Sequence, residues 1–340
     1  MEALTKPRRV RPGDTVAVVS PSFGAVGRWP HRVERATAYL ESLSLNVRLM
    51  PNAGRSEGWA SAPPEDRVAD LHAAFADDGV AVVLCGIGGN HSNQLLPMLD
   101  YDLIRAHPKV FQGYSDITVL HWALAKHAGL ATFYGPALVP ELGEFPQVLE
   151  RTDRYLRAAW FGEEPIVYEP SPVWTDETLD WDTKLDLTRP REQRASEGWV
   201  TIRGGAASGP LLGGCLETMC WHVKGSNAWL PPDGAILLLE TSEEAPSPAD
   251  VDAYLTDLEQ LGVFDAAAGL LLARPMNYSD DDRQQLWEVV ESRTATAGIP
   301  VLGNVEAGHA DPMVTLPFGT TAEVDAGRKT FRLLETATRA

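Results

Sequence analysis

The stretch Phe111-Gln-Gly-Tyr-Ser-Asp-Ile-Thr-Val-Leu-His-Trp-Ala-Leu-Ala125 decides how the first half of the chain folds. It starts as the end of an apolar run, passes through a tight glycine turn and continues as a helix that opens at or just after Ser115. Earlier apolar runs at 15–20 and 80–85 alternate with a helix-like stretch at 31–43. This alternation predicts parallel strands buried on both faces and covered by helices. We therefore expect an open-sheet, flavodoxin-like α/β domain.

The second half of the chain shows the same alternation of apolar runs with helix-like stretches. Its apolar runs lie at 235–239, 269–273 and 300–302, and helix-like segments at 248–261 and 279–297 separate them. The stretch 321–334 alternates apolar and polar residues around Gly327, which predicts an edge hairpin.

Between the two halves, residues 162–208 are rich in proline, tryptophan and charge and show no sustained period. Such a stretch predicts a crossover and a long, functional loop. We expect an N-terminal α/β domain at 1–161, this crossover, and a smaller C-terminal α/β domain at 209–340, with the functional site between the domains.

Composition narrows the class of protein. The 340 residues are 44% hydrophobic, enough to bury a large core. With 47 acidic and 29 basic residues, the net charge of -18 disfavours a nucleic-acid partner. The first apolar run is too short for a membrane span or a signal sequence, so we expect a cytoplasmic protein without a membrane partner. Three cysteines form neither an even disulfide set nor a zinc pattern, which predicts buried thiols and no metal.

Ser115 is a candidate nucleophile. A side chain on a strand-to-helix turn projects from the carboxyl end of the sheet, where open α/β folds place their ligands. The N–H of Asp116, at the positive end of the helix, is suited to stabilise an oxyanion. The turn is similar to a nucleophile elbow, although it lacks the second glycine of GxSxG. The alternative is a serine that only caps the helix.

A glycine loop, Cys85-Gly-Ile-Gly-Gly-Asn-His-Ser-Asn-Gln94, follows the second apolar run at another strand-to-helix turn. One interpretation is an oxyanion hole, with the N–H of Gly88 or Gly89 facing Ser115. A phosphate cradle is a second, but neither GxGxxG nor a Walker lysine is present. A plain glycine turn is the third, and the residues leave the choice open.

A serine nucleophile needs a base and a group that orients the base. Of eight histidines, His91 and His309 lie in loops, and His309 follows the apolar run at 300–302. Glu240 ends the run at 235–239, where an unpaired carboxylate is costly to bury. We therefore favour His309 as base and Glu240 as its partner. The competing carboxylates are Glu243, Glu244 and Glu306.

Taken together, these pieces resemble the serine carboxypeptidases that include LD-carboxypeptidases and microcin C immunity peptidases. The resemblance covers nearly the whole chain and rests on segments in matching order and spacing, at 13–22, 88–96, 113–118, 209–214, 237–242 and 308–312. It implies that Ser115, Glu240 and His309 form a catalytic triad. The stretch Gly88-Gly-Asn-His-Ser-Asn93 is more similar to the microcin-immunity branch than to the murein branch, which tends to carry Arg-Gly-Gly-Tyr-Gly there.

The same branch suggests substrate contacts. Asn90 and His91 belong to the loop that resembles it, although His91 stands where an asparagine is expected. A tryptophan-containing loop in that branch stacks on adenine, and its counterpart here is Trp181 or Trp174.

The resemblance implies a homodimeric hydrolase without metal or cofactor. We expect it to cleave an amide bond in a small peptide or an aminoacyl or peptidyl nucleotide, as in microcin C-type self-immunity or detoxification. An LD-carboxypeptidase that releases a terminal D-amino acid from muropeptides is the alternative within the class. A non-catalytic protein that closes on a small ligand is the alternative from another class, and missing phosphate motifs disfavour a nucleotide-dependent enzyme.

Overall fold

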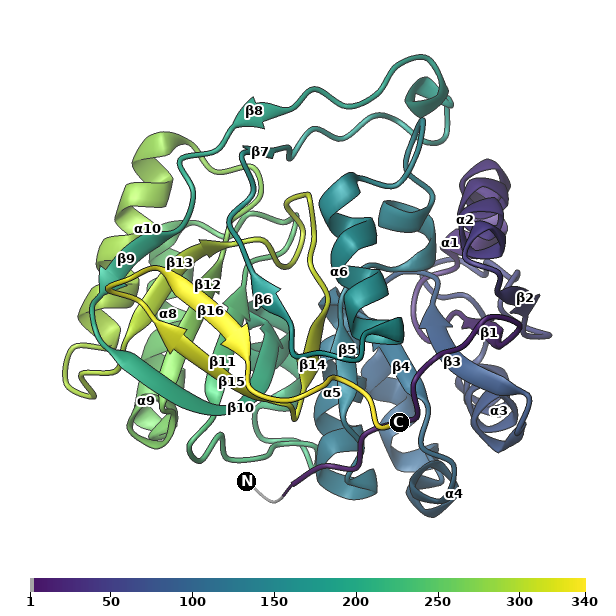
Figure 1. Ribbon diagram of the computed structural model, residues 1–340, viewed down its shortest axis with the longest axis horizontal. Coiled ribbons are helices and arrows are strands. Elements are labelled where there is room, and N and C mark those ends of the chain that lie inside the picture. The colour runs from purple at the N-terminus through teal and green to yellow at the C-terminus, as the bar shows by residue number, and fades with distance from the viewer. Residues whose placement is uncertain (1–2) are drawn as a thin grey trace.

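The computed structural model describes residues 3–340 and contains two large sheets side by side (Figure 1). Five strands of the first sheet are parallel, in the order β2-β1-β3-β4-β5. Their bounds are β1 Thr15–Val19, β2 Asn46–Leu49, β3 Val80–Cys85, β4 Val110–Gly113 and β5 Thr132–Tyr134. This is the flavodoxin-like order, so the expected fold class is confirmed.

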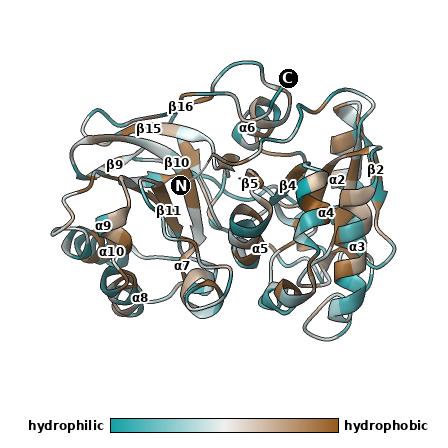
Figure 2. Cartoon of the chain, turned by 90° about the horizontal axis from the view of Figure 1, so that it is seen from below, coloured by the Kyte–Doolittle hydropathy of each residue, from teal (hydrophilic) through white to brown (hydrophobic). Residues whose placement is uncertain are grey.

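Helices cover this sheet. They are α1 Ala25–Arg28, α2 Pro30–Ser42, α3 Pro64–Ala76, α4 Tyr101–Ala106, α5 Thr118–Ala123 and α6 Glu150–Phe161. Local chemistry sets their starts: α3 has Pro64 in its first turn, with Glu65 and Asp66 beside it near the positive end of the helix dipole. In Figure 2, α3 and α4 carry both hydrophobic and hydrophilic segments, as helices with one buried face do.

The second sheet has eight strands in the order β6-β16-β15-β10-β11-β12-β13-β9. Its bounds are β6 Val167–Tyr168, β9 Val200–Arg203, β10 Ala206–Cys215, β11 Ile236–Glu240, β12 Gly269–Ala273, β13 Val301–Val305, β15 Thr321–Asp325 and β16 Thr330–Leu333. The four strands β10 to β13 are parallel and the others pair antiparallel. The longest of them, β10, lies at the centre of the sheet.

Four helices accompany the second sheet, and Figure 2 shows three of them, α8, α9 and α10, along one side of its strands. The helices are α7 Leu216–Thr218, α8 Pro248–Gln260, α9 Val263–Ala266 and α10 Asp280–Arg293. Capping boxes begin α8 at Ser247 and α10 at Ser279, each with an aspartate three residues later.

Two features differ from the sequence expectations. The expected hairpin forms between β15 and β16, but the two-residue strand β6 pairs with β16 and takes the edge. The crossover at 162–208 also supplies β9 to the second sheet and a small hairpin of β7 Val173–Trp174 and β8 Arg194–Ala195. Such short pairings carry no periodic signal in sequence, because two residues cannot show alternation.

The two halves are joined by more than the crossover. Strand β14, Leu316–Phe318, comes from the C-terminal half yet pairs antiparallel with β5 and completes the first sheet. Near the two ends of the chain, Arg8 and Arg339 form a β-bridge. Cys85, Cys215 and Cys220 are free and buried, as expected. No helix within residues 3–340 has the length and apolar character that crossing a membrane requires.

Hydrogen bonds from α5 connect the two halves of the chain. Trp122 on α5 donates its indole N–H to the carbonyl of Gly213 on β10 (2.8 Å). The hydroxyl of Thr118 accepts a hydrogen bond from the N–H of Cys215 (3.0 Å), and Cys215 pairs with Glu240 on β11. The helix that follows Ser115 therefore docks directly beside the strand end that carries Glu240.

Candidate active site

Ser115 stands two residues beyond the carboxyl end of β4, at the start of a 3-10 turn over Ser115–Ile117. Its φ of 63° lies in the left-handed region, which a non-glycine residue adopts only at a cost of about 1–3 kcal/mol. The side chain does not cap the helix. The tight turn instead aims the hydroxyl out of the strand end, as a nucleophile elbow does.

A hydrogen-bonded relay links the three residues that the sequence singled out. The Ser115 Oγ lies 3.1 Å from Nε2 of His309, and Nδ1 of His309 lies 2.8 Å from Oε2 of Glu240. Glu240 is only 1% exposed at the end of β11, and His309 lies in the loop after β13. Gly308 leaves room for this contact, because a Cβ there would lie 2.4 Å from the same Glu240 oxygen.

Tyr134, at the end of β5, joins the relay although sequence analysis missed it. Its hydroxyl donates to Oε1 of Glu240 (2.5 Å) and accepts from the backbone N–H of Ser115 (3.2 Å). Burial, together with the Glu240 charge, raises the pKa of Tyr134 well above 10, so the hydroxyl stays a donor. Its position at the end of the strand beside β4 was the available signal, since Gly113 and Tyr134 are register partners.

Glu243 reaches the relay from the other side. Its Oε2 lies 2.9 Å from Nε2 of His309, the nitrogen that also faces Ser115. Burial alone would lower the pKa of His309, but the charges of Glu240 and Glu243 raise it well above 6.5. The Glu243 side chain is 60% exposed, and its partial desolvation acts to raise its pKa, but the hydrogen bond to His309 lowers that pKa to about 2. The two carboxylates therefore favour the protonated form of the imidazole.

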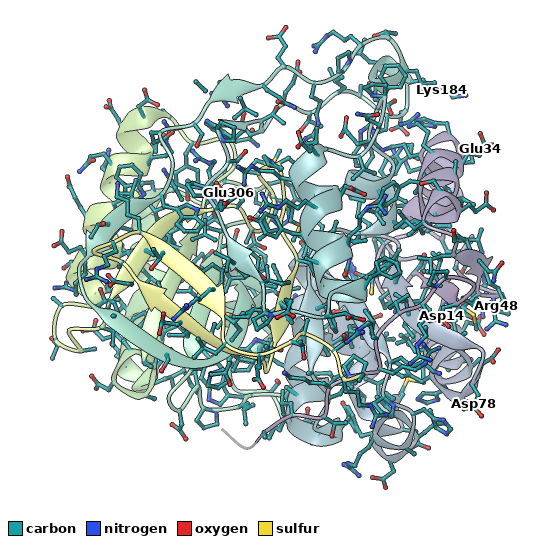
Figure 3. The ribbon with its side chains drawn as sticks, viewed as in Figure 1. Asp14, Glu34, Arg48, Asp78, Lys184 and Glu306 are labelled. Carbon is teal, nitrogen blue, oxygen red and sulfur yellow. The ribbon has the colours of Figure 1, made fainter. Side chains whose placement is uncertain are left out.

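The other two carboxylates weighed in the sequence lie apart from His309. Glu306 accepts from the N–H of Ser171 and the indole of Trp199, both at 2.7 Å. Figure 3 shows it inside the C-terminal half, whereas Glu34 and Asp78 project from the outer edge of the molecule. Glu244 is exposed. Neither contacts a ring nitrogen of His309, whose ion-pair partners are Glu240 and Glu243.

The glycine loop passes directly against Ser115. A Cβ on Gly88 would lie 2.8 Å from the Ser115 Cβ and 3.3 Å from the N–H nitrogen of Asp116. Gly89, with φ of 140°, packs instead against Ser22, whose hydroxyl would meet a Cβ there at 2.5 Å. The backbone of Gly88 is therefore the closer of the two to Ser115.

The side chain of Asp116 anchors this loop. Its Oδ2 accepts hydrogen bonds from the backbone N–H groups of His91 (3.0 Å) and Ser92 (2.9 Å) and from the hydroxyl of Ser22 (2.6 Å). Three loops that follow β1, β3 and β4 are thus tied to one carboxylate. Rigid loops of this kind are what a preorganised oxyanion site requires.

A cavity of about 490 Å³ opens above Ser115 and His309. Most of its remaining lining consists of aromatic and acidic side chains with two arginines, among them Phe23, Trp29, Arg32, Tyr114, Glu141, Glu144, Glu177, Asp180, Trp181, Asp186, Arg191, Glu243 and Asp311. The volume suits a small molecule or a short peptide. Within residues 3–340, no group of three or more His, Cys, Asp or Glu side chains is arranged to hold a metal ion.

Trp181 belongs to an aromatic part of this cavity wall. Its ring meets Trp29 edge-on at 4.9 Å, and the guanidinium of Arg32 lies 4.2 Å from its centroid. The segment between β7 and β8, which carries Trp181, reaches across the top of the molecule toward α1 and α2 (Figure 1). There Asp182 pairs with Arg28 at the end of α1.

The other residues proposed to contact the substrate lie outside the lining of this cavity. They are Trp174, Asn90 and His91. Trp174 is buried, and the guanidinium groups of Arg194 and Arg274 lie 4.2 and 4.7 Å from its ring centroid. Asn90 is exposed, and the ring of His91 lies 6.5 Å from that of Trp59. A tryptophan in a loop or in a two-residue strand gives no periodic signal, so the sequence could not separate Trp174 from Trp181.

Two neighbouring α/β layers, with a serine, a histidine and a glutamate meeting at the ends of their strands, are the arrangement expected of a serine hydrolase. The chain belongs to the LD-carboxypeptidase family. The model of the family's N-terminal domain matches residues 16–135 and that of its C-terminal domain matches residues 208–324.

Named relatives span nearly the full length of the chain. The probable murein peptide carboxypeptidase of Bacillus subtilis is 31% identical over 96% of this chain and 93% of its own. The microcin C7 self-immunity protein MccF of Escherichia coli is 29% identical over 95% of this chain and 94% of its own. A solved structure of MccF in complex with aspartyl sulfamoyl adenosine superposes with a TM-score of 0.89 at 27% identity, covering 98% of this chain and 99% of that one.

Proposed function

We propose that this chain hydrolyses an amide bond through an acyl-enzyme on Ser115, with His309 as general base and Glu240 as the group that orients it. The observation that supports this most is the continuous relay from Glu240 through His309 to Ser115, which opens onto the cavity. The left-handed backbone of Ser115 is a second support, because strain of this kind persists where it positions a reacting group.

The proposed reaction uses these three side chains in turn. Ser115 Oγ attacks the scissile carbonyl carbon while Nε2 of His309 takes its proton, and Glu240 stabilises the resulting imidazolium. The N–H of Asp116 and that of Gly88 or Gly89 hold the developing oxyanion. His309 then returns the proton to the leaving nitrogen as the C–N bond breaks. Water, activated by His309, hydrolyses the acyl ester and restores the serine.

For the substrate, we propose an aminoacyl or peptidyl nucleotide, cleaved in microcin C-type self-immunity or detoxification. MccF, a relative over nearly the whole chain, has been solved with aspartyl sulfamoyl adenosine and with glutamyl sulfamoyl guanosine. Trp181 offers an aromatic surface in the cavity wall, and stacking on a base contributes about 1–3 kcal/mol.

Removal of a terminal D-amino acid from muropeptides is the second candidate, supported by the relative named as a murein peptide carboxypeptidase. Incubation of the purified protein with aspartyl sulfamoyl adenosine and, separately, with a murein tetrapeptide, read by mass spectrometry, distinguishes the two. A non-catalytic ligand-binding protein would convert neither.

Ser115→Ala tests the chemistry itself. We expect turnover of the accepted substrate to fall by about 10³-fold or more while the fold is retained, because the variant lacks the hydroxyl that forms the acyl-enzyme. Glu240→Gln should also lower turnover strongly. Glu244→Gln is the matched control, because Glu244 is an exposed carboxylate four residues away, and it should leave turnover unchanged. Near-normal activity of Ser115→Ala would refute the assignment.

We also propose that the chain is a cytoplasmic homodimer, on the family resemblance. Light scattering coupled to size-exclusion chromatography measures the assembly directly. A mass of one chain would contradict the dimer.

A further inference from the structure

The hydroxyl of Tyr134 lies between the backbone of Ser115 and the carboxylate of Glu240. It accepts the backbone N–H of Ser115 (3.2 Å) and donates to Oε1 of Glu240 (2.5 Å). Ser115 belongs to the N-terminal half of the chain and Glu240 to the C-terminal half. One hydroxyl group thus connects the proposed nucleophile to the proposed orienting carboxylate across the boundary between the halves.

The direction of each hydrogen bond follows from the groups themselves. A backbone N–H only donates, so the Tyr134 oxygen accepts from Ser115 and its single hydrogen is left for Glu240. Oε1 of Glu240 must then accept, while Oε2 faces Nδ1 of His309 at 2.8 Å. With Nδ1 protonated, as the proposed mechanism requires, both carboxylate oxygens receive a donor. This is the pattern of an ionised carboxylate rather than of a protonated acid.

Glu240 needs these donors because its surroundings do not otherwise favour a negative charge. It is only 1% exposed, and burial of a charge without partners is costly. Burial, and after it the charge of Glu240, act to raise the pKa of the nearby Glu217 and of the Cys215 thiol. Within residues 3–340, the side chains that donate to the Glu240 carboxylate are those of Tyr134 and His309.

Packing fixes the Tyr134 ring where this bridge requires it. The side chain is fully buried, and its ring stacks on that of Phe318 with 5.2 Å between the centroids. Phe318 lies on β14, the strand from the C-terminal half that pairs with β5 (Figure 1). The ring of His121 on α5 lies 5.6 Å away. Tyr134→Phe would keep these ring contacts and remove only the hydroxyl.

Tyr134 acts on the site from behind rather than on the substrate. Among residues 3–340, those that line the cavity do not include Tyr134, so its hydroxyl can affect the reaction only through Ser115 and Glu240. The backbone of Ser115 has a φ of 63°, which is costly for serine, and the hydroxyl that accepts its N–H helps to hold this conformation.

We propose that Tyr134 is a positioning residue that keeps Glu240 ionised and holds Ser115 in its left-handed conformation. The inference rests on the proposed function for the roles of Ser115, His309 and Glu240. Without the Tyr134 donor, the proton-free pair of Glu240 and His309 is less stable, so this pair loses its proton only at higher pH. Without the Tyr134 acceptor, Ser115 leaves the reactive geometry more often.

The rate at which a fluorophosphonate labels Ser115, followed over a range of pH, measures both effects with no substrate present. In Tyr134→Phe we expect the rate to fall by about 10- to 100-fold, the size expected for loss of a hydrogen bond to a charged group. The acidic limb of the labelling rate should move to higher pH. Replacing the Tyr134 side chain by that of 3-fluorotyrosine keeps the ring and makes the hydroxyl a stronger donor, so the limb should move to lower pH.

Tyr168→Phe is the matched control. Tyr168 is also a buried tyrosine, and its hydroxyl donates to a backbone carbonyl, that of Thr315, at 2.8 Å. This variant should leave both the labelling rate and the acidic limb unchanged. An unchanged rate in Tyr134→Phe, or a lower rate with the limb in place, would overturn the positioning role. If circular dichroism shows that Tyr134→Phe does not fold, the 3-fluorotyrosine protein decides, and a limb that does not move to lower pH overturns the role.

Failure of the proposed function is a separate result. It is seen when wild-type protein is labelled at Ser115 but hydrolyses neither aspartyl sulfamoyl adenosine nor a murein tetrapeptide. With whichever of the two is hydrolysed, Tyr134→Phe should lower kcat and leave KM unchanged, because Tyr134 does not reach the cavity. A loss confined to KM, or no labelling of Ser115 in the wild-type protein, would contradict the role of Tyr134.

Discussion

At the scale of single residues, Ser115 combines a strained backbone with a reactive position. Its φ of 63° suits glycine far better than serine, so the fold bears a cost there that does not serve packing. The residues around it hold this conformation: Gly88 lies against its side chain, and Tyr134 accepts its N–H. Stability and activity should therefore separate at this position.

Ser115→Gly and Ser115→Ala make this separation measurable. Both should abolish turnover, because both remove the hydroxyl. The free energy of unfolding should be about 1 kcal/mol higher for Ser115→Gly than for Ser115→Ala. The reason is that glycine adopts the left-handed region without a Cβ penalty. Urea unfolding of the two variants gives the difference. An alanine variant as stable as the glycine variant would show that the backbone there is not strained.

Glu243 adds a second negative charge beside His309, the proposed general base. The proposed mechanism requires a neutral His309, so activity should rise as pH rises through the His309 pKa, which Glu240 and Glu243 both raise. Glu243→Gln removes one of the two charges and should move the acidic limb of the kcat/KM profile to lower pH. Glu244→Gln should leave the limb in place. If the acidic limb of the kcat/KM profile stays at the same pH in the Glu243→Gln variant, Glu243 does not face His309 in solution.

At the scale of elements, the site is built from loops at the carboxyl ends of parallel strands. The glycine loop after β3 passes close to Ser115, since a Cβ on Gly88 would lie 2.8 Å from that of Ser115. We expect Gly88→Ala to displace the loop and to lower kcat/KM by about 10²-fold. Gly54→Ala is the matched control, because a Cβ there meets nothing within 4 Å. Steady-state kinetics of the two variants test this, and equal activities would contradict the placement of the loop.

The positions of residues relative to the ends of strands also explain which parts of the site could be predicted from the sequence. Ser115, Glu240 and His309 each follow an apolar run, so their meeting at one edge of the sheets was foreseeable. Tyr134 and Glu243 were not assigned their contacts, because a three-residue strand and a solvated turn give weak patterns. Strand β14 was missed for the same reason, and its partner β5 lies far away in sequence. Short, nonlocal pairings are decided by tertiary packing rather than by local periodicity.

At the scale of the whole molecule, the two halves share one interior. Val18 of β1 and Leu238 of β11 belong to the same buried cluster, and β14 crosses from one half to complete the sheet of the other. We therefore expect one cooperative unfolding transition, with fluorescence and circular dichroism giving the same midpoint. A fragment of residues 1–161 lacks β14 and should not fold. Two separate transitions, or a folded fragment, would contradict this coupling.

We expect the fold as a whole to activate Ser115 through His309. Labelling with a fluorophosphonate, followed by peptide mass spectrometry, tests it without knowledge of the substrate, because only an activated serine displaces fluoride rapidly. We predict a single adduct on Ser115 in the wild-type protein and a large loss of labelling rate in His309→Ala. An adduct on another serine, or an undiminished rate at Ser115 without His309, would contradict the account.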